Sequence, residues 1–170
     1  MRYRERSRRI AQTVAARLDV RFLARPDPEE CSRPRLGHLR ELHAGWHSGI
    51  ELVCHHVPQP EVADAVTGAL PPHSLVVNAT GLGKDAPGSP LTNAVRFPER
   101  GLVWEFNYRG DLVFLEQARA QACPRRLQIE DGWVYFLHGW TRVMADVFNA
   151  DIPKSGPVFD ELSRIAAASR

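Results

Sequence analysis

Short apolar runs that are typical of β-strands alternate with helical patterns from residue 50 onward. The runs lie at 50–57, 74–80, 102–106 and 127–129. Such alternation at short spacing is the pattern of repeated βαβ units, in which parallel strands are joined through helices. The chain is therefore predicted to have an α/β fold with a parallel sheet of about four or five strands and helices on both faces.

Prolines mark the bounds of the expected helices. One helix is expected to begin at Pro60 and to end before Pro71, because proline fits the first turn of a helix but not its interior. Pro153 separates two later helical patterns, and in the second of them the apolar residues recur at helical spacing. These further helices are predicted at 112–121, 133–148 and 158–168.

Residues 1–33 fit this pattern less well. Ile10, Val14 and Leu18 share one helical face and residues 20–24 resemble a strand, but the Arg- and Pro-rich stretch that follows is poor material for a core. A helix is predicted at 35–43. The predicted organisation is an atypical Arg-rich segment at 1–33, a body at 34–150 and a C-terminal helix at 151–170.

The net charge of +2 conceals an asymmetry along the chain. Residues 1–40 carry 11 Arg against five acidic residues, so the remainder is mildly acidic. Nearly all the basic residues are Arg, with only Lys84 and Lys154 as lysines, which indicates a coding bias rather than selection for phosphate binding. We therefore expect no nucleic-acid partner; the alternative is a nucleic-acid-binding arm within residues 1–40.

The cellular compartment is predicted from the lack of a membrane span, a secretory signal and a disulfide pattern in the sequence. No apolar run approaches the ~20 residues of a membrane span, and the N-terminus lacks the apolar core of a secretory signal, although Arg-rich openings also occur in organellar transit peptides. The three cysteines are odd in number and have no short spacing, which argues against disulfides. A cytoplasmic protein without a membrane partner is expected.

Polar residues follow two of the predicted strands, where ligands bind in open parallel sheets. Asn78 and Thr80 stand with glycines at 81 and 83, so they either hydrogen-bond a ligand or stabilise their own tight turn. Glu105 and Tyr108 follow the next strand, and Tyr108 either offers its hydroxyl to a polar substrate or lies on the surface. Both alternatives remain open on spacing alone.

Other site signatures are missing. His43 and His47 have the i, i+4 spacing of a metal pair, but Gly45 interrupts the helical pattern between them and no further ligand stands nearby, so no metal site is expected. The chain contains no GxSxG, GxGxxG or GxxxxGK[ST] motif. Motif spacing alone therefore gives no nucleotide site and no hydrolase triad.

Four segments together suggest a family. They are VVNATGLGKDAPGSPLT at 76–92, LVWEFNYRGDLVFLEQA at 102–118, EDGWVYFLHG at 130–139 and a closing helix after Ile152 and Pro153. In order and spacing they resemble the INATxxG loop, YDxxY strand end, DGxxMLxxQA helix and returning C-terminal helix of shikimate dehydrogenases. The resemblance covers about residues 34–170.

The resemblance implies a fold, a cofactor and a reaction. The fold is a truncated Rossmann-like (doubly wound) parallel sheet, with residues 34–150 as a partial NAD(P)-binding domain. The reaction is the NADP-dependent reduction of 3-dehydroshikimate to shikimate in aromatic amino acid biosynthesis. The resemblance places Asn78, Ala79, Thr80 and Gly81 along the cofactor. It also places Phe106, Gly132 and Tyr135 near the nicotinamide, and Tyr108 toward a shikimate-like substrate.

The sequence also departs from the family pattern at several positions. The family's substrate-binding glutamine falls at Gly139, and Glu105 stands where the family has Asp. The domain with the catalytic Lys–Asp pair and the glycine-rich cofactor loop have no counterpart. We therefore expect the C-terminal part of a longer enzyme, without catalytic residues and inactive alone, with residues 1–33 arising from a frameshift or misplaced start. Arg25 and Asp27 leave NAD as the alternative to NADP.

A second interpretation belongs to another class of protein. The chain would be a non-catalytic remnant of a dinucleotide-binding fold that binds a separately encoded N-terminal half. Trp133, Phe136, Trp140 and the last helix form an apolar face that needs covering. The expected partners are therefore a small molecule in a complete enzyme, and otherwise a second copy of the chain or a chain that supplies the missing domain.

Overall fold

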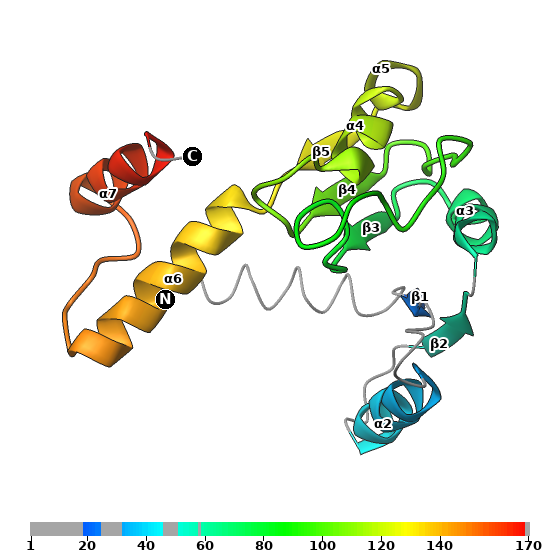
Figure 1. The fold of residues 1–170 in the computed structure, drawn as a ribbon, viewed down its shortest axis with the longest axis horizontal. Helices are drawn as coiled ribbons and strands as arrows, with labels where there is room; N and C mark the ends of the chain where they lie inside the picture. Colours follow the sequence, from blue (N-terminus) through cyan, green and yellow to red (C-terminus); the bar gives the residue numbers. More distant parts are fainter. Residues whose placement is uncertain (1–18, 25–31, 46–50, 58, 169–170) are drawn as a thin grey trace. The chain divides into compact units, whose positions relative to one another are not determined.

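A computed structural model describes residues 19–24, 32–45, 51–57 and 59–168 of the chain (Figure 1). Contacts within the chain divide it into two compact units, residues 1–63 and 64–170, and each is described by itself. The described residues form a mixed α/β structure in which every strand pairing is parallel, as the alternation of strands and helices predicts.

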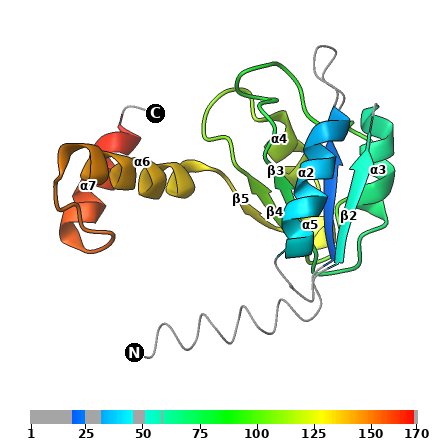
Figure 2. The same ribbon diagram turned by 90° about the horizontal axis from the view of Figure 1, so that it is seen from below.

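The first unit contains one parallel strand pair and a helix. Strand β1 (Asp19–Ala24) pairs along its length with β2 (Glu51–His56), and helix α2 (Ser32–Gly45) connects them and packs against β2 (Figure 2). Both strands and the helix were predicted, although α2 begins three residues earlier than expected. The predicted helical face of Ile10, Val14 and Leu18 lies outside the described residues, as do Arg25, Asp27 and His47.

The second unit contains a three-stranded parallel sheet. Its order is β3–β4–β5, with Leu75 opposite Leu102 and Leu102 opposite Gln128. Helix α4 packs against β4 and β5. The bounds are β3 Leu75–Asn78, β4 Leu102–Glu105, α4 Val113–Arg119, α5 Ala122–Arg125, β5 Gln128–Glu130, α6 Trp133–Phe148 and α7 Pro157–Ala167, while α3, Pro60–Gly68, spans the division between the units.

The predicted elements from residue 50 onward are confirmed within a few residues at their ends. The hydrogen-bonded strand pairings lie within each unit, β1 with β2 in the first and β3–β4–β5 in the second. A single sheet of four or five strands stays a prediction. The doubly wound arrangement and the predicted bounds at residues 33 and 150 stay predictions. None of the helices in the described part of the chain is long and apolar enough to cross a membrane.

One face of the three-stranded sheet is buried under α4. Strand side chains alternate between faces, so Val103 is fully buried while Leu102 and Trp104 are half-buried. Phe114 of α4 meets Phe97 edge to face, with ring centroids 5.6 Å apart. Phe97 belongs to the long loop between β3 and β4, so this loop supplies part of the core.

Side-chain amides attach that loop to the helical segment. Gln117 donates from Nε2 to the carbonyl of Leu91 at 3.1 Å. Gln121 donates from Nε2 to the carbonyl of Val95 at 2.9 Å and accepts from the backbone N–H of Phe97 at 3.2 Å. These bonds satisfy backbone groups of a segment that has no strand neighbour of its own.

Replacing Phe97→Ala is expected to lower the free energy of unfolding by about 3–5 kcal/mol, because a fully buried aromatic side chain leaves a cavity. Phe148→Ala is the matched control, since that ring is 74% exposed, and it should change the value by less than about 0.5 kcal/mol. Urea denaturation of both variants measures the difference. Equal effects would show that the loop is not part of the core.

Candidate functional site

The candidate site begins where β3 and β4 end side by side. Asn78 and Glu105, the last residues of the two strands, lie opposite each other in the parallel register. Carboxyl ends of parallel strands share one edge of a sheet, which is the edge where open α/β sheets bind ligands. The two candidate segments recognised in the sequence are therefore neighbours in space.

A buried carboxylate joins the two strand ends. Glu105 is fully buried, and its Oε2 accepts a 2.6 Å hydrogen bond from Nδ2 of Asn78. Its Oε1 accepts a 2.8 Å bond from the backbone N–H of Asn107. A buried carboxyl group is costly unless such donors surround it, so the surrounding backbone is constrained to supply them.

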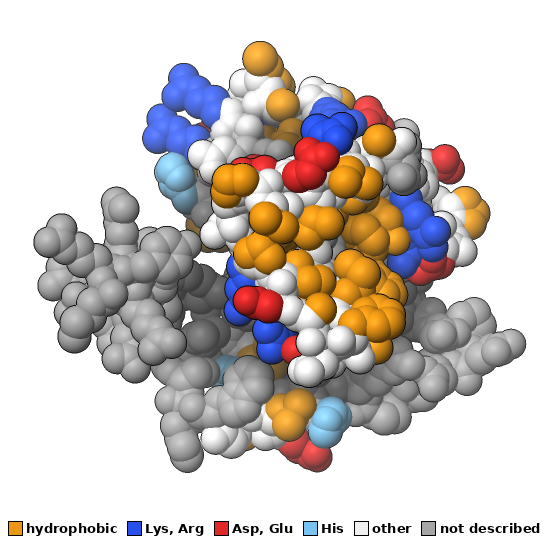
Figure 3. Space-filling model, turned by 90° about the vertical axis from the view of Figure 1, so that its left-hand side faces the viewer, with side chains coloured by type: hydrophobic (Ala, Val, Ile, Leu, Met, Phe, Trp, Pro, Cys, Tyr) orange, Lys and Arg blue, Asp and Glu red, His pale blue; other side chains and the backbone are white. Residues whose placement is uncertain are grey.

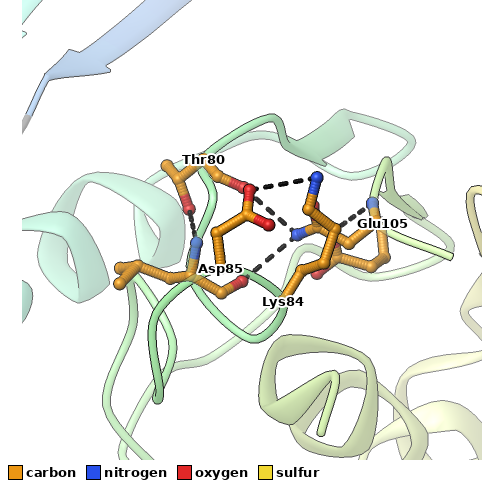
Figure 4. Close-up of polar contacts among 6 residues, drawn as sticks. Thr80, Lys84, Asp85 and Glu105 are labelled. Atoms are coloured by element: carbon orange, nitrogen blue, oxygen red, sulfur yellow. Dashed lines mark hydrogen bonds and ion pairs between the residues drawn. The ribbon is translucent and has the colours of Figure 1, made fainter. Parts of the chain in front are cut away.

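Asn78 and Thr80 use their polar atoms on their own loop. Oδ1 of Asn78 accepts from the N–H of Thr80 at 3.0 Å and from its hydroxyl at 2.7 Å. The amide of Asn107 donates to the carbonyls of Thr80 and Leu82 at 3.1 and 3.2 Å. Figure 4 shows Thr80, Lys84, Asp85 and Glu105 in this cluster. These bonds correspond to the turn-stabilising alternative, and contact of the two side chains with a cofactor stays a prediction.

The glycines of the loop bring its backbone close to a second loop. The carbonyl of Gly81 accepts from the N–H groups of Lys84, Asp85 and Ala86, which closes a tight turn. A Cβ at Gly110 would lie only 2.1 Å from the carbonyl oxygen of Gly83, and both glycines have positive φ. Ala79 and Gly81 remain exposed at the end of β3, where a ligand can reach them.

Aromatic rings from two distant segments line an open hollow beside this cluster. Phe106 stacks on Tyr135 with ring centroids 5.0 Å apart, and Tyr108 stacks on Phe136 at 3.8 Å. Trp140 meets Phe136 edge to face at 6.1 Å. The hollow has a volume of ≈ 250 Å³, and its lining residues, which define the aromatic hollow, are Phe106, Tyr108, Tyr135, Phe136, Gly139, Trp140 and Val143.

Gly132 fixes the position of α6 beside β4. A Cβ at this position would lie 2.0 Å from the carbonyl oxygen of Phe106, so only glycine allows the two backbones to approach this closely. Its N–H donates to the carbonyl of Asn107 at 3.2 Å, and the indole of Trp104 donates to the carbonyl of Asp131 at 3.3 Å. The first turn of α6 is therefore held against the residues that follow β4.

The structure brings some of the predicted site residues together. Phe106, Tyr108 and Tyr135 line one hollow, and Gly132 forms the junction beside it. Asn107 was missed by sequence reasoning, although its place between two named aromatic residues in EFNYRG was a usable signal. Within the described part of the chain, no three His, Cys, Asp or Glu side chains gather as a metal site requires.

Gly132→Ala is expected to lower the free energy of unfolding by about 1–3 kcal/mol, because the added methyl group forces the backbones of α6 and β4 apart. The matched control is Gly139→Ala, inside α6, where a Cβ meets nothing within 4 Å. Alanine favours the helix there, so this variant should gain about 0.5–1 kcal/mol. Thermal unfolding distinguishes the two signs, and a loss in both variants would contradict the assigned junction.

The carboxyl of Glu105 should make stability depend on pH. Burial raises its pKa above the ordinary value of 4.5, although hydrogen bonds from Asn107 and Asn78 oppose the shift. The folded state therefore holds the proton to higher pH than the unfolded chain does. Stability from this group is full below the ordinary pKa and is lost as the pH rises through the folded pKa.

The variant Glu105→Gln removes this titration. The difference in unfolding free energy between the parent protein and the variant should shrink as the pH is raised from 4 toward 7, measured by urea denaturation at each pH. Glu130→Gln, on the exposed part of β5, is the control for general charge effects. A difference that stays constant or grows with pH would refute the assigned direction.

Comparison with known proteins adds no assignment. No protein-family model, no curated protein and no solved structure matches the chain. The interpretation of the site therefore depends on its own residues and contacts, together with the sequence resemblance described above.

Proposed function

We propose that the chain carries the nicotinamide-binding part of a shikimate dehydrogenase-like oxidoreductase with a Rossmann-like fold. The observation that supports this most is the aromatic hollow. Phe106, Tyr108 and Tyr135, which the resemblance assigns to cofactor and substrate, come from two distant segments and line one cavity. The cavity lies beyond the carboxyl end of β4, the edge at which such sheets bind their ligands.

The size and chemistry of the hollow suit a flat ring. A volume of ≈ 250 Å³ is small for a whole dinucleotide but sufficient for one ring of it. Aromatic side chains bind rings by offset stacking or edge-to-face contact. Exposed Ala79 and Gly81 at the neighbouring strand end would lie along the rest of the nicotinamide half, without a Cβ at residue 81 to obstruct it.

The proposed reaction transfers a hydride from NADPH to the carbonyl carbon of 3-dehydroshikimate, while the carbonyl oxygen takes a proton. Tyr108, in the wall of the hollow, would face the substrate. The residues covered by the resemblance include no counterpart of the family's Lys–Asp pair, which would supply the proton. We therefore propose that this chain alone binds the cofactor without turnover. NAD remains the alternative cofactor.

A second candidate function, binding of a partner chain, is favoured by exposed apolar side chains at the C-terminal end of α6 and along α7. On α6, Val147 and Phe148 are 70% and 74% exposed, and on α7 an apolar stripe of Val158, Leu162 and Ile165 is also exposed. Figure 3 shows the molecule from this side, with hydrophobic side chains gathered on it. Apolar surface of this extent is typical of surfaces that another chain covers.

Titration with NADP+ and NAD+ tests the first function. Saturable binding below millimolar concentration is expected, measured by calorimetry and by the rise in melting temperature that ligand binding to the folded state produces. Tyr135→Leu should weaken binding about three- to tenfold, because it removes a stacking ring from the hollow. Phe148→Leu on the same helix lies outside the hollow and should leave binding unchanged.

Absence of binding by either nucleotide up to millimolar concentration would contradict the first function and favour the second. Equal weakening by both variants would show that the nucleotide binds elsewhere.

A further inference from the structure

The described residues that line the aromatic hollow supply five aromatic rings and include no Asp, Glu, Lys or Arg. We propose that the hollow selects a planar ring that carries a positive charge over the same ring without the charge. This inference extends the proposed function, because the nicotinamide ring of the oxidised cofactor is a planar cation and that of the reduced cofactor is neutral. The site would then favour the oxidised form.

The physical basis is the charge distribution of the rings. The faces of Phe, Tyr and Trp carry partial negative charge, which attracts a cation that lies over them and contributes nothing comparable to a neutral ring. Among the described lining residues, the polar side-chain groups are the hydroxyls of Tyr108 and Tyr135 and the indole N–H of Trp140. No Asp or Glu stands among them to pair with a cation, so a cationic ring would be attracted there through the aromatic faces.

The rings are held in place before a ligand arrives. Two stacked pairs, Phe106 with Tyr135 and Tyr108 with Phe136, fix four of them against one another, and Trp140 is set edge-on to Phe136. Tyr135 and Trp140 are nevertheless 55% and 53% exposed, so they retain surface for a ligand. Because these side chains are already ordered, they lose less conformational entropy when a ligand binds to their exposed surface.

A pair of isosteric probes tests the proposal. 1-Methylnicotinamide is a cation, and 3-methylbenzamide has the same shape without the charge. Their dissociation constants are measured by NMR titration against the full chain, together with those of NADP+ and NADPH. We expect the cation to bind on the order of tenfold tighter than its neutral isostere, the ratio that cation–π contacts provide.

Variants show whether the selectivity for the cation arises in the aromatic hollow. Trp140→Leu should bring the ratio of the two constants toward unity, Trp140→Phe should retain most of it, and Phe148→Leu, outside the hollow, should leave it unchanged. Circular dichroism confirms that each variant is folded. These three results, together with tighter binding of the cation by the parent protein, support the proposal.

Equal affinities, tighter binding of the neutral probe, or no binding of either probe would overturn the proposal. If NADP+ binds saturably in those cases, the proposed function still stands. If the cation binds selectively but neither nucleotide does, the proposed function fails and the selectivity of the hollow is upheld.

Discussion

The structure at the carboxyl edge of the sheet depends on one buried carboxyl group. Glu105 can be buried only because Asn78 and the backbone of Asn107 donate hydrogen bonds to it. Those two residues in turn bind the loop that follows β3, through the backbone and hydroxyl of Thr80 and through two carbonyls. One carboxyl group thus ties together two strand ends and the loop between them.

The same arrangement places the aromatic residues. Side chains of an extended segment point alternately to opposite faces. Glu105 and Asn107 are buried in the hydrogen-bonded cluster, and Phe106 and Tyr108 are only partly buried and line the hollow. The buried network and the surface of the aromatic hollow are therefore formed by alternate residues of one short segment. A change to Glu105 would be transmitted to Phe106 by backbone geometry, without any contact between their side chains.

The helices and strands could be predicted from the sequence because the patterns that indicate them lie within each segment. The period of the apolar residues and the prolines at the boundaries were sufficient for the elements from β2 to α7 except the one-turn helix α5, which was not predicted. Phe97 was not predicted as core, because its burial depends on Phe114, which is distant in sequence and packs against a loop without periodicity. Asn78 and Thr80 were recognised as polar residues at a strand end, but spacing could not decide between a ligand and their own turn. The hollow could not be foreseen from spacing, since it requires Phe106 and Trp140, which are distant in sequence, to line the same space.

Helix α6 has different environments along its length, and this bears on how the two candidate functions are related. Its first turns contribute Tyr135 and Phe136 to stacked pairs, while Val147 and Phe148 in its last turn are largely exposed. Helix α7 contacts it through Phe159, which stacks on His138 in the middle of the helix. Because packing of an apolar face supplies most of a helix's stability, the last turns gain least from the rest of this unit. A partner that covered them would stabilise the same helix that carries the hollow, so ligand and partner would occupy different turns and could bind together.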